Sequence, residues 1–538
     1  MDLLTVMATL GLLFSAACAF VFLRRSNSSP SNNNNKQKQY APAIGTILHQ
    51  IVNIPRIYDY HTELSRKHKT FRFSSPFCQY IYTADPIVVE YFLKTNFQNY
   101  GKGWLHYENL KDMFGDGIFS VDGDEWRRQR KLASYVFATK ALRDFSSPIF
   151  RKNASKLAHV VSSCAKSNEK FDVQDLLMKS TMDSIFRIGF GVELNCLDSS
   201  DQEGNEFAKS FDVANEMLIL RYVNPLWKVM RYLNIGSEAK LKDKINLVDE
   251  YVHRLISIRI EQPSETGNKS NVNEDILSRF LDERKKDPQS ISLQFLRDIM
   301  LNFVLAGKDS TAGTLAWFFF LICKNPSVQE KIHKEVMEVT EATEPAVAFD
   351  AFAGKISEDS LNKMHYLHAA LTETLRLYPP GPMDGKVCFS DDTLPGGYTV
   401  RKDDVVFYQP YPMGRMEYLW GADAEAFCPE RWLNDDGIFQ PESPYKFTAF
   451  QVRNDPSVQF SFTVRTLHKS EAACVVCFQA GPRLCLGKEF AYRQMKIFTA
   501  VLLRFFEFKL SDEGKVARFK TSMTLLIDGG LFLEVCRR

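Results

Sequence analysis

The residues best suited to chemistry stand in one loop near the C-terminus, Phe478-Gln479-Ala480-Gly481-Pro482-Arg483-Leu484-Cys485-Leu486-Gly487. A single cysteine is framed by glycines four residues before it and two after it, with an arginine at minus two. Glycine permits a tight turn and a close approach of the backbone to a flat cofactor. Backbone N–H groups of such a loop can donate to the sulfur and tune its electron donation. The spacing therefore suits a loop that wraps one metal-bound thiolate, Cys485.

A second set of reactive side chains interrupts an apolar-periodic segment, Ser292 to Cys323, which predicts a helix of roughly 48 Å. Its middle reads Ala306-Gly307-Lys308-Asp309-Ser310-Thr311. A glycine, an acid and two hydroxyls oppose helix propensity, so we expect a local distortion there. Hydroxyls that bond back to carbonyls can open a groove for a ligand and its waters. A polar notch that only packs is the alternative.

Glu373 and Arg376 place a carboxylate and a guanidinium three residues apart on one predicted helix. Such a pair is ordinarily exposed and contributes a few tenths of a kcal/mol. The helix is apolar around the pair and ends at two prolines, which favours a buried pair with a third partner. Arg431, in Phe427-Cys428-Pro429-Glu430-Arg431-Trp432, is the candidate.

Trp126 and Arg130 lie one helical turn apart, so both can face one ligand. An indole N–H and a guanidinium that point the same way suit a carboxylate. A basic, exposed helix face is the alternative explanation.

The elements that must position these residues are mostly helices. Amphipathic patterns run from Tyr40 to about residue 380, with a short strand pair near Thr70 to Ala84. Short alternating runs follow Pro379, and residues 394–400 predict a hairpin. Residues 261–274 and 340–356 are expected to be loops. The fold class is therefore mainly α with small β-sheets (α+β).

Composition narrows the function classes. The 538 residues are 45% hydrophobic and include 42 phenylalanines, enough for a large core. Sixty-seven basic against 65 acidic residues give no support to nucleic-acid binding. Eleven scattered cysteines fit a reducing compartment better than a disulfide framework. Cys474 and Cys477 have the spacing of a redox or zinc pair, but no second pair or histidine cluster accompanies them, which favours two incidental cysteines.

The N-terminus predicts membrane attachment. Leu3 to Leu23 is an uncharged, mostly apolar run of the length that one helix needs to cross a bilayer. Arg24 and Arg25 follow it, so the positive-inside rule places the rest of the chain in the cytosol. A cleaved signal peptide is the alternative, but a basic N-terminal region is missing. The expected organisation is an anchor (1–25), a flexible polar linker (26–39) and a folded body (40–538).

In this order along the chain, the motifs resemble those of the cytochromes P450. The loop around Cys485 is similar to the family's Phe-x-x-Gly-x-Arg-x-Cys-x-Gly motif. The segment from Ala306 through Thr311 is similar to the family's oxygen-binding motif. The resemblance implies the cytochrome P450 fold, with haem b as cofactor and Cys485 as the axial thiolate ligand of its iron. It also implies electrons from NADPH through a separate NADPH-cytochrome P450 reductase.

The resemblance further implies roles for individual residues. Asp309 would relay protons, and Ser310, where the family usually has threonine, would hold the water that delivers them to dioxygen. Thr311 completes this catalytic set. A structural triad would support the cysteine loop, and the remaining matched positions would contact the haem. The triad is Glu373, Arg376 and Arg431, and the haem-contacting positions are Trp126, Arg130, Ala306, Gly307, Phe478, Gly481, Arg483 and Gly487.

Three longer stretches, residues 117–123, 410–416 and 487–495, resemble the plant P450 group that hydroxylates long-chain fatty acids at or near the ω-carbon. The resemblance implies a monooxygenase with a lipophilic substrate, held in the endoplasmic reticulum membrane by one span. Two alternatives remain. One is a P450 that rearranges hydroperoxides, although such enzymes tend to lack the acid and alcohol pair. The other is a non-catalytic splice product unable to seat haem.

Residues 452–479 form an insertion in front of the cysteine loop. The dipeptide Phe-Gln occurs before it, at Phe450-Gln451, and at its end, at Phe478-Gln479. Removal of the 28 residues restores an uninterrupted motif, and we interpret the segment as a retained intron. A genuine surface loop is the alternative. Either Phe450 or Phe478 can then be the phenylalanine that packs beneath the cysteine.

Overall fold

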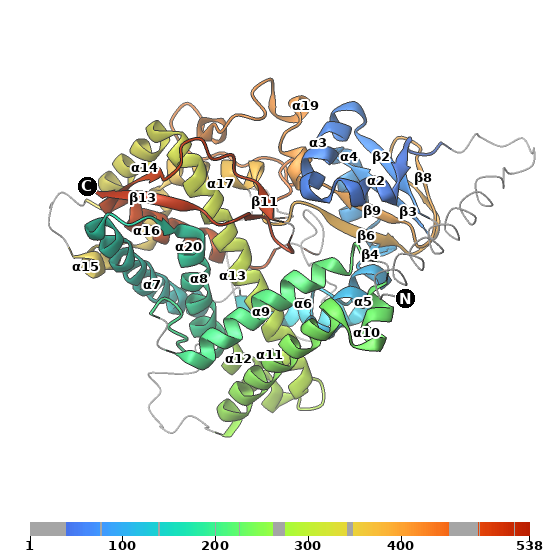
Figure 1. The fold of residues 1–538 in the computed structure, drawn as a ribbon, viewed down its shortest axis with the longest axis horizontal. Coiled ribbons are helices and arrows are strands. Elements are labelled where there is room, and N and C mark those ends of the chain that lie inside the picture. The colour runs from blue at the N-terminus through green and yellow to red at the C-terminus, as the bar shows by residue number, and fades with distance from the viewer. Residues whose placement is uncertain are drawn as a thin grey trace, which may run out of the picture.

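The computed structural model describes residues 39–75, 78–137, 140–198, 201–224, 226–261, 275–341, 348–450, 483, 485–520 and 522–538. These residues form a mainly helical body with four small sheets. The strands of the largest sheet gather at one side of the molecule and most long helices at the other (Figure 1). The predicted fold class is confirmed.

The helices and strands are bounded as follows. The helices are α2 (Ile47–Val52), α3 (Ile57–Lys67), α4 (Pro86–Glu90), α5 (Gly103–Phe114), α6 (Gly123–Phe137), α7 (Lys140–Ser167), α8 (Val173–Phe190), α9 (Gln202–Leu220), α10 (Trp227–Leu233), α11 (Gly236–Glu261), α12 (Ile276–Lys286), α13 (Leu293–Lys324), α14 (Pro326–Val339), α15 (Phe349–Lys355), α16 (Glu358–Lys363), α17 (His365–Leu377), α18 (Pro410–Met413), α19 (Glu417–Trp420) and α20 (Lys488–Phe505). The strands are β1 (Ala43–Thr46), β2 (Thr70–Ser74), β3 (Gln79–Thr83), β4 (Tyr100–Gly101), β5 (Phe171–Asp172), β6 (Asp384–Cys388), β7 (Asp392–Thr393), β8 (Thr399–Val400), β9 (Val405–Tyr408), β10 (Phe506–Leu510), β11 (Phe519–Lys520), β12 (Leu526–Ile527) and β13 (Phe532–Arg537).

The largest sheet has the order β1-β2-β3-β9-β6-β4. Strands β2 and β3 form the strand pair predicted near residues 70–84 and run antiparallel. The predicted hairpin at residues 394–400 is also present, as β7 paired with β8. Gly396 and Gly397 turn this hairpin with φ angles of +90° and +85°, a region that glycine enters without steric cost.

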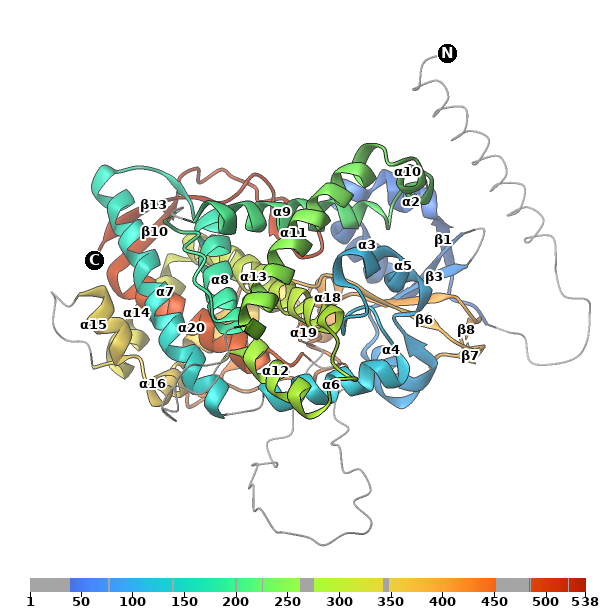
Figure 2. The same ribbon diagram turned by 90° about the horizontal axis from the view of Figure 1, so that it is seen from below.

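Helix α13 runs through the middle of the molecule in both views (Figures 1 and 2). Ser292 caps it, since its hydroxyl accepts the N–H of Phe295 at 3.0 Å. Towards its C-terminal end, Trp317 is 1% exposed and stacks on Tyr378 at 3.9 Å between ring centroids. The helix predicted from Ser292 to Cys323 is thus confirmed within one residue at each end.

Two local expectations are wrong. Residues 340–356 were expected to be a loop, yet they contain α15, whose Phe349 and Phe352 are buried. Phe349 and Phe352 pack against Phe505, so tertiary burial stabilises a segment that its small and polar residues mark as irregular. The expected distortion in α13 is also absent, because the helix continues without a break through residues 306–311.

Several predictions fall outside the described residues. These are the anchor at 1–25, most of the linker at 26–39, the loop at 262–274, the Cys474–Cys477 pair and the insertion at 452–479. Across the part of the chain that the structure does describe, no helix combines the length and apolarity needed to span a bilayer. The eight cysteines in that part are free thiols.

Candidate active site

Cys485 lies three residues before the start of α20, near the end of the predicted ligand loop. Its side chain is solvent-accessible, yet burial raises the pKa of its thiol. A backbone hydrogen bond from Gly487 and the nearby charges of Arg130 and Lys488 act in the opposite direction and lower the pKa of this thiol. The surroundings therefore favour a thiolate once a metal compensates for its burial.

Phe450, which lies two residues before the insertion, contacts the cysteine loop. Its carbonyl accepts the N–H of Cys485 at 3.2 Å. Its side chain is 7% exposed, and its ring lies 5.2 Å from that of Tyr492 on α20. The chain thus reaches the cysteine before the insertion begins. Phe478 and Gly481, the other predicted loop residues, lie outside the described residues.

The predicted carboxylate-binding residues converge beside this thiol. The guanidinium carbon of Arg483 lies 4.5 Å from the Trp126 ring centroid. Arg483 donates to the carbonyl of Val121 at 2.8 Å and to the carboxylate of Asp122. Its Nε is buried without a hydrogen-bond partner. Trp126 thus contacts Arg483 of the cysteine loop, although the two residues lie more than 350 positions apart.

Arg130 adds a positive charge that its neighbours do not neutralise. Burial lowers the pKa of Arg130 to about 10, and the charge of Arg483 lowers it further, whereas Cys485 raises it. Arg130 forms no ion pair or side-chain hydrogen bond with another described residue. Arg130 and the unused Nε of Arg483 are therefore available to an anionic partner. The two carboxylates of a haem fit this description.

Sequence reasoning missed a further charged cluster close to Arg483. The Asp384 carboxylate accepts from Lys102 at 2.9 Å and from Lys386 at 2.7 Å. Burial alone would raise the pKa of Asp384, but the two ammonium groups hold it well below its usual range. Burial lowers the pKa of Lys386 to about 7, and the charges of Lys102 and Arg483 add to this effect. The period-two alternation of β6, with Asp384 and Lys386 on one face, was the available signal.

The predicted oxygen-binding segment presents one face of α13 to open space. Ala306 is exposed and Ser310 is partly exposed, although the helix on both sides of them is buried. The Ser310 hydroxyl donates to the Ala306 carbonyl at 2.5 Å, as expected for a hydroxyl that bonds back along a helix. Asp309 and Thr311 are 5% and 3% exposed and lie on other faces.

Gly307 was expected to contact the cofactor, but a Cβ built there points elsewhere. It would lie 2.7 Å from Cδ1 of Ile185 on α8. Glycine at this position therefore lets α8 and α13 approach closely, and contact of Gly307 with the cofactor stays a prediction.

The predicted triad is assembled around the Glu373 carboxylate. Glu373 and Arg376 have no exposed side-chain surface and share two hydrogen bonds of 2.7 Å. Arg431 Nε lies 3.5 Å from the same carboxylate. Trp432 Nε1 donates to it at 2.8 Å, and the N–H of Cys428 at 3.0 Å. This network ties α17 to the segment that follows α19, which leads to Phe450.

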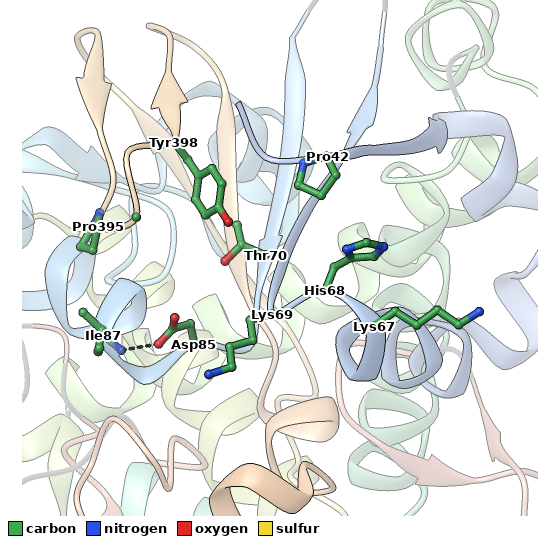
Figure 3. Close-up of a pocket in the computed structure, with 10 residues that line it drawn as sticks. Pro42, Lys67, His68, Lys69, Thr70, Asp85, Ile87, Pro395 and Tyr398 are labelled. Atoms are coloured by element: carbon green, nitrogen blue, oxygen red, sulfur yellow. Dashed lines mark hydrogen bonds between the residues drawn. The ribbon is translucent and has the colours of Figure 1, made fainter. Parts of the chain in front are cut away.

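A surface pocket of about 480 Å³ lies elsewhere, between the β7–β8 turn, the start of β2 and Pro42 (Figure 3). Tyr398 and Lys69 line it, and the Asp85 carboxylate accepts the N–H of Ile87 at its edge. None of the predicted site residues takes part. We therefore locate the candidate site at Cys485 and the accessible face of α13.

Similarity to known proteins places this chain in one family. The family model described as Cytochrome P450 matches residues 37–535. The chain is 46% identical to Cytochrome P450 704C1 of Pinus taeda, over 94% of this chain and 93% of that protein. It is 42% identical to Cytochrome P450 704B1 of Arabidopsis thaliana, over 92% and 94%, and 38% identical to Cytochrome P450 86B1 of the same plant, over 90% and 82%. The chain therefore belongs to the cytochrome P450 family of monooxygenases.

Proposed function

We propose that this cytochrome P450 is a membrane-anchored enzyme that hydroxylates long-chain fatty acids at or near the ω-carbon. The observation that carries the oxidative chemistry is the solvent-accessible Cys485 thiol, with Arg130 and the unused Nε donor of Arg483 nearby. The choice of substrate rests on the resemblance of residues 117–123, 410–416 and 487–495 to plant fatty acid hydroxylases.

The enzymes of this family use a haem-thiolate iron and electrons from a redox partner. When bound, the haem supplies the activation of dioxygen and the oxidation of an unactivated C–H bond. Cys485 would provide the thiolate, and Arg130, Arg483 and the Trp126 indole would bind the haem carboxylates. The Gly487 N–H donates to the sulfur and stabilises its negative charge.

Proton delivery is assigned to the polar segment of α13. Asp309 would take up protons and pass them to water held by the Ser310 hydroxyl, with Thr311 completing the set. Because Ser310 donates to the Ala306 carbonyl at 2.5 Å, its hydroxyl has to turn away from that carbonyl before it can donate to a water. Ala306 and Ser310 both face open space, which leaves room for this rotation.

The roles of Glu373, Arg376 and Arg431 are structural in this proposal. Their network would hold the chain that leads into Phe450, and Phe450 contacts the cysteine loop directly. A substitution that breaks this network would therefore shift Phe450 and, through it, the thiolate ligand.

Residues 1–25 are proposed to anchor the enzyme in the endoplasmic reticulum membrane, with residues 26–39 as the linker and the catalytic body in the cytosol. NADPH-cytochrome P450 reductase is the proposed electron donor. A fatty acid in the bilayer would then lie close to the enzyme that oxidises it.

The ligand assignment is tested by the absorption spectrum of the ferrous carbon monoxide complex. The Cys485→Ala variant should lose the band that marks a thiolate ligand, whereas the matched variant of an exposed cysteine, Cys536→Ala, should keep it. A thiolate band retained in Cys485→Ala would refute the assignment.

The substrate assignment is tested with the full-length enzyme, reductase, NADPH and long-chain fatty acids of several lengths. Products hydroxylated at or near the ω-carbon are expected. Absence of hydroxylated product with every fatty acid contradicts this substrate class. Reductase-independent conversion of a fatty acid hydroperoxide would instead indicate a rearranging enzyme.

A further inference from the structure

One buried ammonium group links α13 to α9 next to the predicted proton relay. Lys308 is 1% exposed, and its Nζ donates to the Asp309 carboxylate at 2.9 Å. The same Nζ donates to the carboxylate of Asp212 on α9. A single positive charge is therefore shared between two carboxylates on two helices. Neither Lys308 nor Asp212 was singled out by the motif that identifies Asp309.

The charge state of this cluster follows from its neighbours. Burial alone would lower the pKa of Lys308, but Asp212 and Asp309 overcome it and raise that pKa above its ordinary value. Burial raises the pKa of Asp212, and the charge of Asp309 adds to this increase, while Lys308 opposes it. Lys308 is thus charged at neutral pH, and the two carboxylates compete for it.

The two carboxylates differ in their access to water. The side chain of Asp212 keeps 39% of its surface exposed, whereas that of Asp309 keeps 7%. The more exposed carboxylate of Asp212 therefore binds the same ammonium group that fixes the buried carboxylate of Asp309. The other ionisable groups that act on this cluster are Glu216 on α9, the Cys196 thiol and, beside that thiol, Asp183 on α8.

We propose that Lys308 and Asp212 are positioning residues for proton delivery. Lys308 orients the Asp309 carboxylate, and Asp212 holds the same ammonium group from α9, so that one cation fixes the buried carboxylate in place. This inference rests on the proposed role of Asp309. The electrostatic reason is that an ammonium group shared with a second carboxylate stabilises the first carboxylate less than an unshared one does.

The test uses full-length haem-loaded enzyme with reductase and a fatty acid, and measures turnover against pH together with the solvent deuterium isotope effect. Asp212→Asn leaves Lys308 wholly to Asp309, so the pH limb of turnover should move down by about one pH unit. Lys308→Gln removes the cation, so the same limb should move up by a similar amount.

Two control variants separate this effect from a general loss of structure. Lys308→Arg keeps the charge and should retain the wild-type pH limb. Glu203→Gln makes the matched change of a carboxylate to an amide on α9, where Glu203 pairs with Arg254 at the surface. It should leave the pH limb and the isotope effect unchanged.

The outcomes distinguish this inference from the proposed relay. Shifts of the same sign in Asp212→Asn and Lys308→Gln, or no shift in either, overturn the positioning role. If Lys308→Gln fails to bind haem, the Asp212→Asn variant alone decides: a downward shift of its pH limb supports the positioning role, and an upward shift or no shift overturns it. An Asp309→Asn variant with unchanged turnover and isotope effect overturns the relay itself, whereas loss of the pH limb in Asp309→Asn supports it.

Discussion

Phe450 provides a direct test of which side of the insertion supports the cysteine loop. Its side chain is 7% exposed and packs on Tyr492, and its carbonyl accepts the N–H of Cys485. Substitution of a buried phenylalanine by alanine loses transfer free energy and leaves a cavity. Phe450→Ala should therefore lower the free energy of unfolding by about 3–5 kcal/mol.

This loss can be converted into a melting temperature. The unfolding entropy of a chain of about 500 residues is roughly 1 kcal/mol per kelvin, so Phe450→Ala should melt about 3–5 °C lower. The assay is thermal unfolding of haem-loaded enzyme followed by haem absorbance, with the carbon monoxide spectrum as a second readout. The matched control, Phe478→Ala, should stay within about 0.5 kcal/mol of wild type.

Deletion of Val452–Gln479 also tests whether Phe450 supports the cysteine loop, because it shortens the segment between Phe450 and Cys485. The 34 residues at 451–484 that separate Phe450 from Cys485 become six, and the loop-closure entropy then favours folding by about 1.5 kcal/mol. The deletion variant should keep the thiolate band and melt slightly higher. A retained intron further predicts a dominant transcript that lacks these codons. If Phe478→Ala destabilises the enzyme while Phe450→Ala does not, the assignment of Phe450 is wrong.

Two other predictions concern buried groups. Glu373→Gln removes the carboxylate that pairs with Arg376 in a fully buried site, so it should lower the free energy of unfolding by about 3–5 kcal/mol. The exposed control Glu90→Gln should change the free energy of unfolding little. Equal losses in the two variants would contradict this explanation. Burial lowers the pKa of His61 to about 4, so the folded state binds fewer protons than the unfolded state between pH 6.5 and 4. Stability from this group is therefore lost as pH falls through that window, by about 3 kcal/mol in total. His61→Leu should lose less stability than wild type from pH 6.5 to 4, and identical pH dependence in chemical denaturation would disprove the role of His61.

Local signals in the sequence predicted much of the fold. The apolar period predicted α13 to within one residue, because this periodicity is a local property of the sequence. The glycine pair at Gly396 and Gly397 defined a hairpin for the same reason. The triad was also predictable, since an ion pair on an apolar helix has to find further polar partners when it is buried.

Other features depended on contacts between distant segments. Residues 349–355 are helical because Phe349 and Phe352 pack on Phe505, which lies about 150 positions later. Gly307 matched a cofactor motif, yet its Cβ direction meets Ile185 on α8. No local pattern specifies either neighbour, so neither outcome could be predicted from the sequence.

The sequence by itself determined which group can bind the metal, because a single cysteine with its flanking glycines specifies both the ligand and the turn that presents it. It also identified Asp309 as the candidate acid. Only the tertiary structure decided which charges from distant segments act on these groups: Arg130 on Cys485, and Lys308 with Asp212 on Asp309. The physical reason is that electrostatic interaction depends on distance in space and on burial, and neither follows from separation along the chain.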